Sequence, residues 1–183
     1  MSASPESSMT TLWSGRFSEA PDAAAFEWGS SFGFDRRLFE DDVTGSLAYA
    51  RALRGAGVLT ADEAAAIETA LTEIRAHGIA HPESVDGDDE DVHSYVERLL
   101  VARLGDTGKR LHTGRSRNEQ VSLDLRLYLR RRIPLLQGAV ADVIDALTQQ
   151  ARAAGDALMP SYTHFRPAQP VLVAHWLLAH AAP

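Results

Sequence analysis

The stretch VSLDLRLYLRRRIPLLQ, residues 121–137, decides the fold class because it is compatible with a strand and with a helix. Its first apolar residues alternate as in a half-buried strand: Val121, Leu123, Leu125, Leu127 and Leu129. Leu and Arg nevertheless favour helix, and apolar residues continue at helical spacing as far as Leu147. We therefore predict one long helix from about Asn118 to Ala154, which Pro134 could bend. Apolar residues on nearly all its sides predict burial inside a bundle.

Two helices are predicted well before this stretch. Apolar residues at three- and four-residue spacing indicate the first, which begins at Arg36 and ends near Gly55 or Gly57: Phe39, Val43, Leu47 and Ala50. A capping box of Thr60 and Glu63 begins the second, which Gly78 should end. Its apolar stripe is Ile67, Leu71 and Ile74.

An acidic loop separates these helices from a third. Six carboxylates lie between Glu83 and Asp91, and the last aspartates are suited to a helix N-terminus. The helix should end at Gly105, with a buried stripe of Val92, Val96, Leu99 and Leu100. The segment 161–170, SYTHFRPAQP, is predicted to be a proline-stiffened loop that leads into a last helix from Val171. The predicted fold class is all-α.

Composition limits the function classes. The chain has 183 residues, 45% of them apolar, and a formal net charge of −7. A negative mean field argues against nucleic acid and acidic membranes as partners. No cysteine is present, which excludes thiolate chemistry and disulfides and fits a reducing cytoplasm. No signal peptide and no apolar run of membrane-spanning length are apparent, so we expect a soluble cytoplasmic protein.

The segment TGRSRNEQ, residues 113–120, gathers hydrogen-bond donors at a helix start. Between residues 103 and 132, nine basic residues face only three acidic ones, which reverses the sign of the whole chain. Arginine forks and free helix N–H groups are what a site for carboxylate or phosphate needs. The alternative is a polar helix start without a ligand. The run from Arg130 to Arg132 is interpreted as a solvated helix face.

Histidines are the other candidates for chemistry. His164 lies in the proline-stiffened loop, where it could exchange protons near neutral pH or serve only as a hydrogen-bonded loop residue. His93 follows the acidic run, whose aspartates could set its charge, although an ordinary exposed histidine is the favoured interpretation. His77 and His81 have no evident third ligand, so no metal site is predicted.

Five segments together resemble, in order and spacing, the N-terminal half of argininosuccinate lyase, a family within the fumarase/aspartase superfamily. They are LWSGRF (12–17), SFGFDRRL (31–38), DEDVHSYVE (89–97), TGRSRNEQV (113–121) and SYTHFRPAQP (161–170). Residues 1–11 are small and polar and are predicted to form a disordered tail. The resemblance implies an N-terminal helical domain over 12–112 and the truncated first part of a central long-helix bundle over 113–183. It also implies a homotetramer at full length.

The resemblance implies reversible elimination of argininosuccinate to arginine and fumarate, in arginine biosynthesis and the urea cycle, without metal or organic cofactor. His164 matches the family's acid/base histidine. The candidate substrate-binding residues are Ser31, His93, Arg115, Ser116, Arg117, Asn118 and Thr163. Their donors would stabilise a carboxylate that gains charge in the intermediate.

The chain departs from the family in a few places. Glu119 occupies a position where the family usually has Asp, Ser161 one where it usually has Gly, and Arg166 one where it usually has Gln. A serine loop that shares the proton transfer belongs to the family's later half, so we expect an incomplete active site and no turnover by this chain alone. Two alternatives stay open: a non-catalytic helical assembly protein of the same descent, and a lyase for a different fumarate-forming substrate.

Overall fold

The computed structural model describes residues 22–182. The chain divides between Tyr128 and Leu129 into two compact units, which are described separately. The predicted tail over residues 1–11 and the motif at 12–17 lie outside the described residues. No helix within residues 22–182 combines the length and the apolarity needed to cross a membrane.

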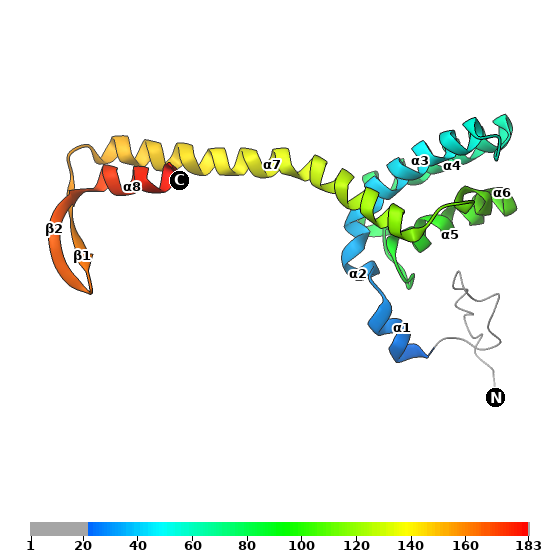
Figure 1. Ribbon diagram of the computed structural model, residues 1–183, viewed down its shortest axis with the longest axis horizontal. Helices are drawn as coiled ribbons and strands as arrows, with labels where there is room; N and C mark the ends of the chain where they lie inside the picture. Colours follow the sequence, from blue (N-terminus) through cyan, green and yellow to red (C-terminus); the bar gives the residue numbers. More distant parts are fainter. Residues whose placement is uncertain (1–21, 183) are drawn as a thin grey trace. The chain divides into compact units, whose positions relative to one another are not determined.

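The first unit is helical throughout its described part (Figure 1). The α-helices are α1 (Ala23–Gly29), α2 (Phe32–Asp35), α3 (Phe39–Gly55), α4 (Ala61–Ala80), α5 (Val92–Leu104), α6 (Asp106–Lys109) and the start of α7 (Arg117–Ala154). Short 3-10 turns are η2 (Arg36–Leu38), η3 (Pro82–Ser84) and η4 (Arg110–His112). The three helices predicted before residue 105 are confirmed.

The core of this unit lies where α3, α4 and α5 pack together. The stripe residues Val43, Ile67 and Leu100 are fully buried. Burial of such aliphatic side chains stabilises the fold by about 2 kcal/mol each. Aromatic side chains extend the core, because the ring of Tyr95 contacts those of Phe32 and Phe39. The apolar faces read from the sequence are therefore the faces that pack.

Capping groups set the ends of the helices. Thr60 and Glu63 form the predicted capping box of α4. Asp91 accepts a hydrogen bond from the Ser94 N–H at the start of α5. Gly105 ends α5 with a φ of 58°, which glycine adopts without steric cost.

Gly78 does not end α4, as the sequence suggested, but lies within it. A Cβ at this position would lie 2.3 Å from Cε1 of Phe39. The glycine therefore serves the close approach of Phe39 to α4, and the helix continues to Ala80.

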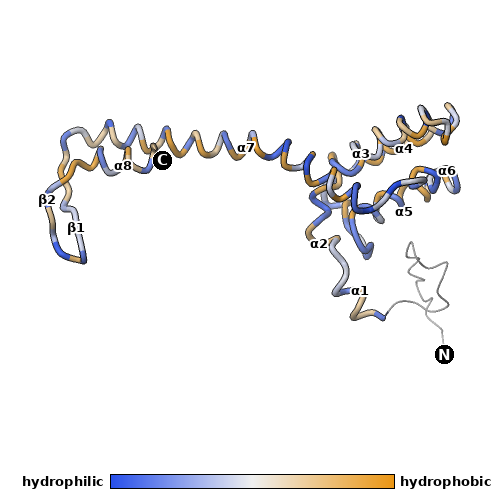
Figure 2. Tube along the Cα trace, viewed as in Figure 1, coloured by the Kyte–Doolittle hydropathy of each residue, from blue (hydrophilic) through white to orange (hydrophobic). Residues whose placement is uncertain are grey.

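The long helix α7 is confirmed, and it contains Pro134. Apolar residues recur along its whole length (Figure 2). Within this chain many of them are exposed, including Leu135, Leu136, Val140 and Val143. The predicted burial inside a bundle is thus not met by the described residues themselves, which leave an apolar face of α7 uncovered.

The second unit corrects one prediction. The segment predicted as a loop forms an antiparallel hairpin of β1 (Leu158–Thr163) and β2 (Arg166–Leu172), followed by α8 (Val173–Ala181). The prolines argued against a strand, because proline has no N–H to donate to a neighbouring strand. In a two-stranded hairpin, however, each strand has one edge without a neighbour, and proline is tolerated where the N–H would point to that edge. Over residues 22–182 the chain is accordingly predominantly helical, with one small two-stranded sheet.

Candidate functional site

The N-terminus of α7 is built by the TGRSRNEQ segment. Ser116 precedes the helix, and its Oγ accepts a hydrogen bond from the Asn118 N–H at 3.2 Å, as an N-cap does. Gly114 has a φ of 70°, and the turn there is held by Tyr49, whose hydroxyl donates to the Thr113 carbonyl oxygen. The Asn118 side chain is exposed at this helix end.

Arg115 is turned into the first unit. Its Nη1 donates to Ser46 Oγ at 2.9 Å, and its guanidinium lies 5.1 Å from the ring centroid of Tyr49. Burial lowers the pKa of Arg115, while the carboxylates of Asp42 and Asp124 oppose this shift. The group stays cationic at neutral pH and is held on two sides.

Arg117 bridges α7 and α5. Its Nη1 donates to Gln120 Oε1 at 3.0 Å, its Nη2 donates to Ser94 Oγ at 3.3 Å, and its Nε lies 3.4 Å from Asp91 Oδ2. The DEDVHSYVE and TGRSRNEQ motifs, which are separated in sequence, thus meet at the N-termini of two helices.

Ser31 joins the same region. Its Oγ donates to Asp35 Oδ2 at 2.5 Å, and Asp35 Oδ1 accepts from the Val92 N–H at the start of α5. The Ser31 N–H also donates to the Glu90 carbonyl oxygen. Burial raises the pKa of Asp35, against the hydrogen bonds from Ser31 and Val92. Three of the five quoted motifs therefore converge within the first unit.

His93 is buried, with 2% of its side chain exposed, so the favoured interpretation as an exposed histidine is wrong. Its Nδ1 lies 2.8 Å from Asp42 Oδ1 and 3.3 Å from Asp124 Oδ2. Gln120 Nε2 donates to the same Asp42 oxygen. The two carboxylates that contact His93 come from α3 and α7, and the charge of Asp91, in the acidic run that precedes His93, also raises its pKa.

The charges in this cluster depend on one another. Burial alone would lower the pKa of His93, but its contacts with Asp124 and Asp42 raise that pKa to about 9. Burial raises the pKa of Asp124 to about 6, and the nearby charge of Asp42 acts in the same direction. Burial would raise the pKa of Asp42 too, but the hydrogen bonds from His93 and Gln120 lower it. At neutral pH an imidazolium lies between two carboxylates.

Asp42, His93 and Asp124 also offer three potential metal-ligand atoms within 4.8 Å of one another. The 2.8 Å between His93 Nδ1 and Asp42 Oδ1 is a hydrogen-bond distance. Two ligands at about 2.1 Å from a tetrahedral ion would lie about 3.4 Å apart. In this arrangement the three residues form a hydrogen-bonded charge cluster.

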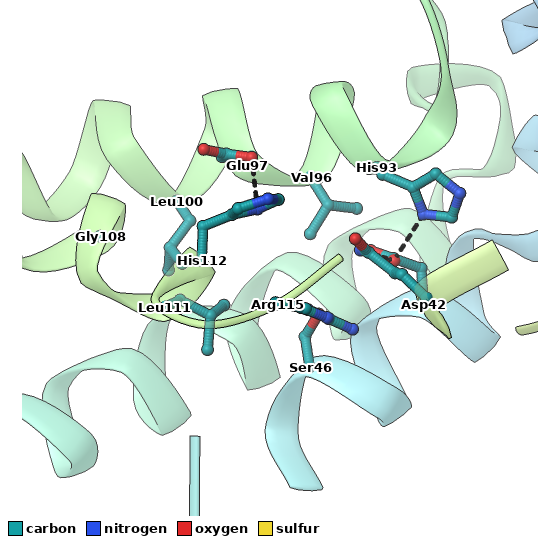
Figure 3. Close-up of a pocket in the computed structure, with 11 residues that line it drawn as sticks. Asp42, Ser46, His93, Val96, Glu97, Leu100, Gly108, Leu111, His112 and Arg115 are labelled. Atoms are coloured by element: carbon teal, nitrogen blue, oxygen red, sulfur yellow. Dashed lines mark hydrogen bonds and ion pairs between the residues drawn. The ribbon is translucent and has the colours of Figure 1, made fainter. Parts of the chain in front are cut away.

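A cavity of about 20 Å³, enough for one water molecule, opens beside this cluster (Figure 3). Asp42, Ser46, His93 and Arg115 contribute to its polar lining. Figure 3 shows the His93 ring directed at the Asp42 carboxylate. His112 and Glu97 form a second pair beside the cavity, with 3.4 Å between Nδ1 and Oε2.

Thr163 and His164 belong to the second unit, where they lie at the end of the hairpin. Thr163 pairs with Arg166, so His164 and Phe165 form a two-residue turn. Both turn residues have positive φ, 50° and 61°, as a type I′ turn requires. Side chains with a Cβ are uncommon there, so the turn is strained. Phe165 is fully exposed.

Sequence reasoning missed the buried polar residues that support the arginines. Asp42 and Ser46 lie beside the apolar stripe of α3, and Asp124 occupies a polar position in the alternation of residues 121–129, where a carboxylate gives no sign of burial. A carboxylate that is fully buried needs a partner. Its partner could not be read from the sequence, because His93 lies on a different helix.

A family model described as Lyase matches residues 15–183, and the chain belongs to that family. Among curated proteins, the argininosuccinate lyase of Koribacter versatilis (strain Ellin345) is 48% identical over 170 residues, covering 93% of this chain and 36% of that protein. The argininosuccinate lyase of Desulforudis audaxviator (strain MP104C) is 44% identical over 172 residues, covering 94% and 38%.

Solved structures support the same fold. A variant of EDDS lyase with bound fumarate matches with a TM-score of 0.66 and 26% identity, over 86% of this chain and 30% of that one. A fumarate lyase from Mesorhizobium sp. BNC1 matches with a TM-score of 0.59 and 25% identity, over 88% and 37%. The chain thus spans little more than a third of the length of the curated relatives it matches.

Proposed function

We propose that this chain belongs to an argininosuccinate lyase, which eliminates arginine from argininosuccinate to form fumarate, in the reversible step of arginine biosynthesis. The observation that carries the proposal is the convergence of Ser31, Arg117 and the N-terminus of α5 beside Arg115. Relatives named argininosuccinate lyase at 44% and 48% identity support this substrate.

The chemistry assigned to the site is carboxylate binding. Abstraction of a proton beside a carboxylate places additional negative charge on that group. Cationic forks and helix N–H donors that are already oriented stabilise such charge more than they stabilise the ground state. Arg115, Ser116, Arg117 and Asn118, together with Ser31 and Thr163, are the proposed substrate-binding residues. His93 is proposed to support them from the buried cluster.

His164 is proposed as the acid/base residue. It is exposed at the hairpin turn, and histidine is the side chain that most often serves as a general acid or base. The strained turn fixes its backbone, which is consistent with a functional position.

Assembly into a homotetramer in the cytoplasm is also proposed. The exposed apolar residues of α7, from Leu129 to Ile144, form a surface larger than isolated surface residues produce. Long helices of other subunits and of the same polypeptide would cover it, as in a helical bundle.

The proposal is tested with a joined lyase, defined as this chain followed by the C-terminal part of the Koribacter versatilis enzyme. Fumarate release from argininosuccinate is followed by ultraviolet absorbance. Turnover of argininosuccinate in preference to other fumarate-forming substrates supports the proposal. Assembly without turnover supports the non-catalytic alternative, and preference for another succinyl compound supports a different lyase.

A further inference from the structure

One face of α3 contacts the arginine-bearing segment repeatedly. Asp42, Ser46 and Tyr49 lie at positions i, i+4 and i+7, so their side chains share that face. We call these three residues the α3 stripe. Gly45 lies between them, and a Cβ there would be 3.0 Å from Cδ2 of Leu123, so the stripe lies close to α7.

We propose that the α3 stripe is a set of positioning residues that fixes Arg115 and Arg117 for carboxylate binding. This inference rests on the proposed function, because it concerns how the same site is held in place.

Arg115 is held directly. Ser46 takes one of its five N–H donors, and the guanidinium carbon lies over the Tyr49 ring, 5.1 Å from the ring centroid. Tyr49 also fixes the preceding turn, since its hydroxyl donates to the Thr113 carbonyl oxygen at 2.9 Å. The position of the guanidinium is therefore restrained by two side chains before a ligand arrives.

Arg117 is held through Gln120. A carboxylate only accepts hydrogen bonds, so Asp42 selects the NH₂ end of the Gln120 carboxamide. The Oε1 end is then directed at Arg117, whose Nη1 donates to it at 3.0 Å. His93, bound to the same Asp42 oxygen, keeps this carboxylate charged in a buried position.

Such an arrangement lowers the cost of binding. An arginine side chain that is ordered in the free protein loses less conformational freedom when a carboxylate binds. The positioning residues would act on affinity through the arginines, without touching the ligand.

The 183-residue chain is the sample, and fumarate is the probe. Every sample carries Leu135→Gln and Leu136→Gln, which limit association through the exposed apolar face of α7. The variants are Asp42→Asn, Ser46→Ala and Tyr49→Phe, with Thr44→Val and Tyr162→Phe as controls that lose hydroxyls elsewhere. NMR measures the mobility of the Arg115 Nε–H group and the exchange of the amides of residues 117–120. Fumarate titration gives the dissociation constant.

Each stripe variant should accelerate amide exchange in the first turn of α7. The acceleration should be about tenfold or less for Ser46→Ala and Tyr49→Phe, which each lose one hydroxyl, and larger for Asp42→Asn. Arg115 should become more mobile, and fumarate affinity should fall about five- to tenfold. In a double-mutant cycle, Asp42→Asn and Gln120→Met should not be additive, because they break the same contact. If Asp42→Asn does not fold, the two hydroxyl variants decide.

Unchanged Arg115 mobility and unchanged exchange in all folded variants would overturn the positioning role. Additive effects in the cycle would likewise overturn the route through Gln120. If this chain shows no fumarate response while the variants do mobilise Arg115, positioning stands and carboxylate binding by this chain alone fails, whereas the proposed function itself is decided by turnover of the joined lyase.

Discussion

His93 Nδ1 and Asp42 Oδ1 lie 2.8 Å apart in the interior of the first unit, and the same Asp42 oxygen accepts a hydrogen bond from Gln120. A buried histidine from α5 is thus connected to the first turn of α7. Removal of one member of such a cluster leaves a buried charge without its partner, which is strongly destabilising. The cluster consequently links the stability of the unit to the geometry of the arginine segment.

The first prediction concerns pH. The pKa of His93 is raised from 6.5 to about 9 by folding, so its contribution is fully present below pH 6.5 and is lost as the pH rises through about 9. The unfolding free energy should fall by up to about 3 kcal/mol across this window. Urea unfolding at several pH values measures the fall.

The imidazole resonances of His93 provide the check on this assignment. Their midpoint should lie near 9 in the unaltered chain. Asp124→Asn should move the midpoint downward, because one of the two carboxylates that stabilise the imidazolium is removed. A midpoint close to 6.5 in the unaltered chain would refute the ion cluster.

The second prediction concerns Gly78. A Cβ at this position would lie 2.3 Å from Cε1 of Phe39, and an aromatic ring inside the core cannot move away freely. Gly78→Ala should therefore cost about 1–3 kcal/mol of stability despite the better helix propensity of alanine. Gly55→Ala, whose added Cβ meets nothing within 4 Å, is the control and should be neutral or stabilising. Equal stabilities of the two variants would disprove the close packing.

The third prediction concerns association. Leu135 and Leu136 are exposed by 61% and 65% in this chain. The isolated chain should form oligomers or aggregates in light scattering, and replacement of both leucines by Gln should reduce them. Ala139→Gln is the control, because Ala139 is also exposed on α7 but removes little apolar surface when it is replaced. A clean monomer of the unaltered chain would contradict this prediction.

The fourth prediction concerns His164. In the joined lyase, His164→Asn should lower kcat by about 10²- to 10⁴-fold, as loss of a general acid/base does. His175→Asn, on α8, is the matched histidine control and should retain most of the rate. If His164→Asn assembles normally and its rate is unchanged, the acid/base role of His164 is contradicted and the non-catalytic assembly protein is favoured.

The helices could be predicted from the sequence because each has its own local signals. The capping box at Thr60 and the glycine at 105 are examples, and so is the length of α7, where helix propensity outweighed a strand-like alternation. The hairpin could not be predicted in this way. Pro160, Pro167 and Pro170 indicate a loop as long as the strand register is unknown, because the register decides which residues need an N–H for pairing.

The candidate site could be predicted only in part. The arginine segment was visible as a reversal of charge within an acidic chain. The burial of His93 was not, because its partners Asp42 and Asp124 come from two other helices and the contact depends on tertiary packing. The α3 stripe was hidden for the same reason, since its polar residues look like the solvent side of an amphipathic helix.

The central claim is that the Arg115 fork binds a carboxylate that gains charge during elimination. The most direct measurement is kcat/KM for argininosuccinate in the joined lyase carrying Arg115→Lys, beside Arg126→Lys as a control on the exposed side of α7. A fall of about 10²-fold or more, mainly in kcat and only in the Arg115 variant, is expected because lysine cannot reproduce the bidentate fork. Equal kcat/KM values for the two variants and the unaltered joined lyase would contradict the claim.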